Sequence, residues 1–193
     1  ERNHFFANVA SAPIIPAALA QPCVDAAKKK CDWNETPEWA VVAGGLEKDA
    51  FIIERVAKET DVDARLIAAA VIPEQLRFFT SEREVFKRYF EPLKILGSLS
   101  QFSLGVSGIK QETAKEIERH ALDAASPFYP GPEYAKLIEY PEGANADAEL
   151  YRRLTDAKDH YYSYLYTALY IKEVEAQWER AGFGSELTPD IAI

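Results

Sequence analysis

Residues 62–75, with the sequence VDARLIAAAVIPEQ, decide the fold of this chain. Small and apolar residues fill positions 66–72 without interruption, and such a run predicts a helix with its side chains in a core. Asp61 or Asp63 can cap the start of this helix, because an aspartate at that place accepts a hydrogen bond from an unpaired backbone N–H. Pro73 then strains or ends the helix, since proline has no backbone N–H to donate.

Helices are also expected on both sides of this segment. Residues 46–60, LEKDAFIIERVAKET, have apolar residues at helical spacing and predict the preceding helix. Ser81 is followed three positions later by Glu84, a pair that forms a capping box at a helix start. We therefore expect a third helix from Ser81 to Pro92.

The second half of the chain alternates breaks and helices. Residues 97–108 (GSLSQFSLGVSG) are small and polar and predict a loop or a short β-hairpin. A helix is expected over about 112–125, then a turn-rich break at 126–132 and a long helix over roughly 147–181. Gly182 suits the position just past that helix. The predicted fold class is mainly α, with at most a small sheet.

The N-terminal region differs from the rest in composition. Residues 1–45 contain several prolines and a Gly44-Gly45 pair and are predicted to be an irregular arm. Residues 46–193 are predicted to form one domain.

Cys23 and Cys31 are the two cysteines of the chain. Their short separation allows a disulfide, which suits an oxidising compartment, but two unpaired thiols are the other interpretation. The chain starts at Glu1 and contains no Met, which is typical of a protein whose targeting segment has been removed. Both features favour export to a compartment such as the periplasm or the cell exterior.

Composition excludes several classes of function. With 193 residues and a net charge of −9, the chain lacks the basic surface that binding to nucleic acid needs. No apolar run approaches the ~20 residues of a membrane-spanning helix. Neither His-x-x-x-His nor Cys-x-x-Cys spacing occurs. We expect no metal and no cofactor.

Glu74 is the candidate for acid–base chemistry. It follows the apolar run and Pro73, and partial burial there would favour its protonated, neutral form. A glutamic acid that holds its proton near neutral pH can act as a general acid. The alternative is a solvated glutamate at a helix end.

Two segments resemble motifs of the soluble lytic transglycosylases and goose-type lysozymes. Val62, Asp63, Leu66 and the apolar run match the catalytic-helix motif in register, and the resemblance places Glu74 on the catalytic glutamate. Residues 103–114, SLGVSGIKQETA, resemble the second motif. Five of its positions match, namely Ser103, Gly105, Ile109, Thr113 and Ala114.

The resemblance implies a lysozyme-like helical domain that acts on the glycan strands of peptidoglycan. Glu74 would be the catalytic residue. The implied substrate-binding residues are Gln75, Ser103, Gly105, Gly108, Ile109 and Gln111. The implied reaction cleaves the β-1,4 bond between N-acetylmuramic acid and N-acetylglucosamine and leaves a 1,6-anhydro end. Hydrolysis by water would instead make the protein a lysozyme.

Several positions depart from the family pattern. Gln75 replaces a serine, Gly108 stands where glutamine is common, and Gln111 stands where proline is common. A Tyr-Asn motif expected after the long helix does not occur, so either a C-terminal portion is missing or the site is incomplete. The tyrosines of 161–170 suit sugar stacking or, by their spacing, core packing. The acidic residues of 82–91 could supply a second acid or form a solvated face; they include Glu82, Glu84 and Glu91.

Three functions therefore remain open. The first is a peptidoglycan-cleaving enzyme, with glycan strands and possible envelope proteins as partners. The second is a non-catalytic lysozyme-like protein that binds glycan or serves as an envelope scaffold. The third is a helical interaction domain in which both motif matches are accidental, which would leave Glu74 far from the Gly105 loop.

Overall fold

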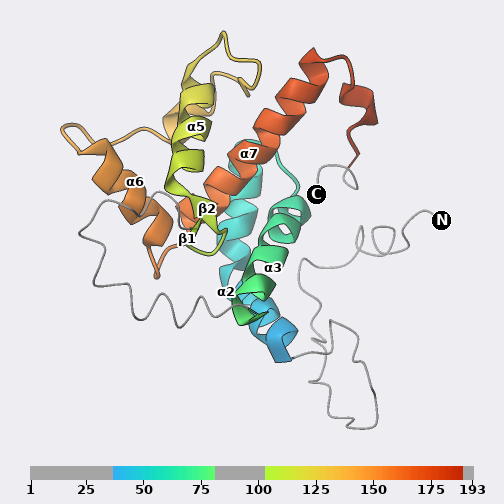
Figure 1. The fold of residues 1–193 in the computed structure, drawn as a ribbon, viewed down its shortest axis with the longest axis vertical. Coiled ribbons are helices and arrows are strands. Elements are labelled where there is room, and N and C mark those ends of the chain that lie inside the picture. The colour runs from blue at the N-terminus through green and yellow to red at the C-terminus, as the bar shows by residue number, and fades with distance from the viewer. Residues whose placement is uncertain (1–36, 81–102, 189–193) are drawn as a thin grey trace.

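The computed structural model of the chain describes residues 37–80 and 103–188 (Figure 1). Most of these residues are helical, which confirms the mainly α prediction. The helices are α2 (Pro37–Thr60), α3 (Ala64–Thr80), α5 (Gln111–Leu122), α6 (Ala146–Thr155) and α7 (Tyr161–Arg180). Strands β1 (Ser103–Leu104) and β2 (Ile109–Lys110) and the short 3-10 turns η4 (Ala135–Leu137) and η5 (Gly184–Glu186) complete the described elements.

Helix α2 begins earlier than predicted. Residues 37–45 were expected to belong to an irregular arm, but they form the first turns of this helix. Proline is well tolerated in a first helical turn, where its missing N–H would have no partner. Gly44 and Gly45 do not break α2 because their neighbours Val42, Ala43 and Leu46 are buried in the core. Burial of apolar surface outweighs the weak helix propensity of glycine, which costs about 1 kcal/mol per residue.

Alanine at position 44 is expected to stabilise the protein. Gly44 is exposed, and a Cβ added there meets no other atom within 4 Å. Gly44→Ala should raise the free energy of unfolding by about 0.5–1 kcal/mol, because alanine loses less backbone entropy in a helix. Urea denaturation followed by circular dichroism measures this change. A midpoint at or below that of the parent would contradict the helical assignment of residues 37–45.

Helix α3 is capped as predicted but does not end where expected. Asp63 is the capping residue, because its Oδ1 accepts a hydrogen bond from the backbone N–H of Arg65 at 2.9 Å. Pro73 lies inside α3, which continues to Thr80, so of the two expectations for this proline the helix end is wrong. Pro73 is exposed, and water can therefore solvate the backbone carbonyl that its ring leaves without a donor.

Strands β1 and β2 form the short hairpin that was one of the two predictions for this region. They pair antiparallel, with Ser103 opposite Lys110 and Leu104 opposite Ile109. The hairpin leads directly into α5. Its connecting turn, residues 105–108, is called the hairpin turn below.

The long helix predicted over 147–181 is two helices. Asp156 ends α6, and its Oδ1 accepts hydrogen bonds from the backbone N–H groups of Lys158 (2.9 Å) and Asp159 (3.1 Å). The Oδ1 of Asp159 then accepts from the N–H of Tyr161, where α7 begins. Short aspartate side chains compete with the helix for backbone donors, and here they stabilise a turn. Gly182 has φ +84° just past α7, as predicted.

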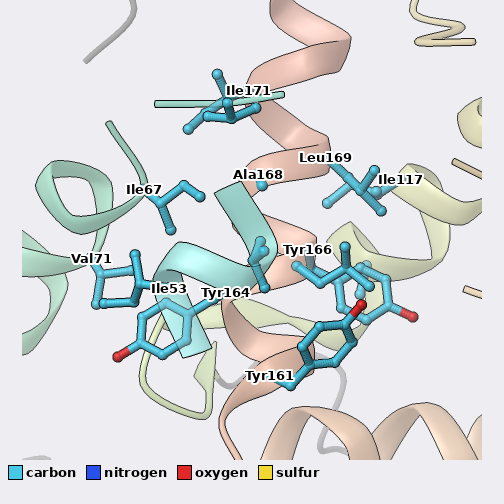
Figure 2. Packing of buried hydrophobic residues seen from close by; sticks show 14 of the residues in the cluster. Ile53, Ile67, Val71, Ile117, Tyr161, Tyr164, Tyr166, Ala168, Leu169 and Ile171 are labelled. Atoms are coloured by element: carbon cyan, nitrogen blue, oxygen red, sulfur yellow. The ribbon is translucent and has the colours of Figure 1, made fainter. Parts of the chain in front are cut away.

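One cluster of buried apolar side chains joins α2, α3, α5, α6 and α7 (Figure 2). Tyr161, Tyr164 and Tyr166 of α7 belong to it, which confirms core packing for these three tyrosines. Tyr170 is instead exposed. Helix α7 supplies more of the core than any other described helix, because buried residues lie on every side of its first three turns.

Some predictions concern residues outside the described ranges. These are the Cys23–Cys31 disulfide, the helix from Ser81 to Pro92, and the acidic residues Glu82, Glu84 and Glu91. In the described part of the chain, none of the helices has the length and apolar character needed to cross a membrane.

Candidate active site

Glu74 lies against the hairpin turn. Its side chain is half-buried on α3, and Gly108 ends the turn with φ +66°. A Cβ built on Gly108 would be 2.6 Å from Oε2 of Glu74 and 3.3 Å from its Cδ, so a larger residue at position 108 would displace the Glu74 carboxylate. Two segments that are more than thirty positions apart in the sequence therefore meet at the Glu74 carboxylate.

Gln75 makes a second connection from α3 to the same turn. Its Nε2 donates a hydrogen bond to the backbone carbonyl of Val106. The carboxamide of Gln75 thus contacts protein backbone.

The other side of the hairpin turn packs against the junction of α6 and α7. Gly105 has φ +62°, and a Cβ built there would be 2.2 Å from the backbone O of Leu154 and 2.4 Å from Oγ of Ser163. Glycine is required at position 105 both by its backbone conformation and by the lack of space. The hairpin turn is therefore held between α3 and the α6–α7 junction.

Two side-chain clusters fix that junction. His160 Nδ1 lies 2.5 Å from Oδ2 of the buried Asp49 on α2, and the Tyr164 hydroxyl donates to the same oxygen at 2.9 Å. Burial and the negative charge of Asp49 raise the pKa of Tyr164, so its hydroxyl stays protonated and can donate. On α6, the buried guanidinium of Arg153 donates to the backbone carbonyls of Ile138 (2.8 Å) and Glu139 (2.5 Å).

The remaining predicted site residues have separate surroundings. Ile109 on β2 is half-buried and packs against the core. The Nε2 of Gln111 donates to the backbone carbonyl of Asp147 at 3.2 Å, which connects α5 to the start of α6. Ser103 begins β1. Glu74, Gln75, Gly105 and Gly108 are thus the predicted residues that the structure brings together at the hairpin turn.

Sequence analysis missed Ser107. This residue lies in the hairpin turn between Val106 and Gly108, is 7% exposed, and its hydroxyl has no hydrogen-bond partner among the described residues. A buried hydroxyl without a partner is costly and marks a constrained position. The one feature of the sequence that could have indicated Ser107 is its position inside the second motif, residues 103–114.

No His, Cys, Asp or Glu cluster suited to a metal ion occurs within residues 37–80 and 103–188. Comparison of the chain with protein-family models, with curated proteins and with solved structures finds no match.

Proposed function

We propose that this chain is a lytic-transglycosylase-like domain that cleaves peptidoglycan glycan strands, with Glu74 as its acid and base. The observation that supports this most is the approach of Gly108 to the Glu74 carboxylate. The two motif-like segments are distant in sequence, and accidental matches would have no reason to meet. The lysozyme-like assignment of the helical domain belongs to the same proposal.

In this mechanism Glu74 first protonates the oxygen of the β-1,4 bond between N-acetylmuramic acid and N-acetylglucosamine. The bond breaks, and a positive, oxocarbenium-like centre develops at the anomeric carbon of N-acetylmuramic acid. The acetamido group of the substrate stabilises this centre. The 6-hydroxyl of the same sugar then attacks the carbon, gives its proton to the ionised Glu74 and closes a 1,6-anhydro ring. One carboxyl can serve both steps, because it gives up its proton in the first and accepts the proton of the hydroxyl in the second.

We further propose that the protein acts after export to the bacterial envelope, where its glycan substrate lies. Glycan strands are then its main partner, and envelope proteins are possible further partners.

The decisive variant is Glu74→Gln. It keeps the shape of the side chain but removes the transferable proton, and the release of soluble fragments from purified sacculi should fall by about 10²–10⁴-fold. Mass analysis of the digests identifies 1,6-anhydro ends, which distinguish a transglycosylase from a hydrolase. The matched control is Glu54→Gln on the exposed face of α2, which should digest sacculi at the parent rate. Undiminished digestion by Glu74→Gln would show that the proposal is wrong.

A non-catalytic glycan-binding or scaffold protein is the second candidate. It is favoured by Gly108, which offers no side chain to a substrate, and by the carboxamides of Gln75 and Gln111, which contact backbone. Binding of the parent protein to sacculi without release of soluble fragments would select this function.

A further inference from the structure

Gln75 and its neighbour Glu74 reach the same turn from one helix. Consecutive residues of an α-helix point about 100° apart around its axis, so their side chains leave α3 in different directions. The Gln75 carboxamide nevertheless donates a hydrogen bond to the carbonyl of Val106, and the Glu74 carboxylate lies close to Gly108. A hydrogen bond at Val106 and a close approach of Glu74 at Gly108 restrain the rotation of the turn as well as its distance from the helix.

The hairpin turn needs such a restraint. The strands on either side of it are two residues each, and a two-stranded ribbon is only marginally stable by itself. Gly105 is held from the other side by Leu154 and Ser163. Gln75 supplies a hydrogen bond from α3 to this turn, at the backbone carbonyl of Val106.

The chemistry of the amide suits this place. The Val106 carbonyl needs a donor, and an amide supplies one without adding a charge beside the Glu74 carboxylate. A serine, which the resembled family usually carries here, has a much shorter side chain. The use of the carboxamide for a backbone contact also differs from the saccharide contact expected from the sequence.

We propose that Gln75 is a positioning residue, which holds the Val106–Gly108 backbone against Glu74. Its effect on catalysis rests on the proposed function, whereas its hold on the turn does not. The two parts can therefore be tested separately on the full chain.

The main variant is Gln75→Met, which keeps the length of the side chain and removes the donor. Hydrogen exchange measured by mass spectrometry should show amides of 105–110 exchanging about three- to tenfold faster, which corresponds to one lost hydrogen bond. Amides of α5 should keep the parent rate. For sacculus digestion, kcat should fall about tenfold while KM changes less than twofold, because the turn is displaced but the saccharide loses no direct contact.

Gln75→Asn is the second variant. It retains the amide but shortens the side chain, so it should reproduce the faster exchange, and it provides the measurement if Gln75→Met does not fold. Unchanged exchange in the folded variants, or a raised KM with an unchanged kcat, would overturn the proposal. If the parent itself releases no fragments, the proposed catalytic function fails, and the exchange rates alone decide the role of Gln75.

Discussion

Gly105→Ala is expected to lower the free energy of unfolding by about 3–5 kcal/mol, enough to unfold much of a marginally stable domain. Two costs combine at this position. The backbone has φ +62°, which costs a residue with a Cβ about 1 kcal/mol. The new Cβ would also lie 2.2 Å from the backbone O of Leu154, and backbone moves less readily than a side chain.

Urea denaturation followed by circular dichroism measures the effect of Gly105→Ala. The matched control is Gly182→Ala, because Gly182 also has a positive φ of +84° but a Cβ there meets nothing within 4 Å. This control should lose only about 1 kcal/mol. Equal losses in the two variants would mean that the hairpin turn does not pack against the α6–α7 junction.

Glu173→Gln is expected to stabilise the protein at neutral pH, by up to about 3 kcal/mol at pH 7. Glu173 on α7 is 4% exposed, and its Oε1 has no hydrogen-bond partner among the described residues. Burial raises the pKa of Glu173 to about 8, from an ordinary value of 4.5. The charge of Arg119 on α5 lowers this pKa, and that of Glu116 on the same helix raises it, but burial is the largest cause.

The sign of the pH dependence follows from the raised pKa. Between about pH 4.5 and 8, Glu173 is protonated in the folded chain and ionised in the unfolded chain, so the folded state holds more protons. The free energy of unfolding therefore falls as the pH rises through this window. Glutamine cannot ionise, so the advantage of Glu173→Gln should be near zero at pH 4.5 and grow up to pH 8.

Urea denaturation at several pH values across this window measures the difference between parent and variant. Glu179→Gln, on the exposed end of the same helix, should leave the pH dependence of the parent unchanged. A variant Glu173→Gln whose stability falls with pH as steeply as that of the parent would contradict the assignment of this dependence to Glu173.

Local sequence patterns predicted most helices because capping and periodicity are properties of neighbouring residues. Asp63 at the start of α3 and Gly182 after α7 are examples in which one side chain, or its absence, sets a helix end. The same rules failed at Gly44-Gly45 and at Pro73. There, burial of the surrounding apolar side chains and solvation of an exposed face decided the outcome, and neither is visible in a short window of sequence.

The sequence by itself determined a mainly helical chain and singled out Glu74, since an apolar run before a carboxylate is a local feature. It also singled out Gly105 and Gly108 of the second motif as candidate site residues. Only the tertiary structure decided that Gly108 meets Glu74 and that Gln75 binds Val106. The physical reason is distance along the chain: contacts between α3 and the hairpin turn depend on how several helices pack around one core, and no local pattern records that packing.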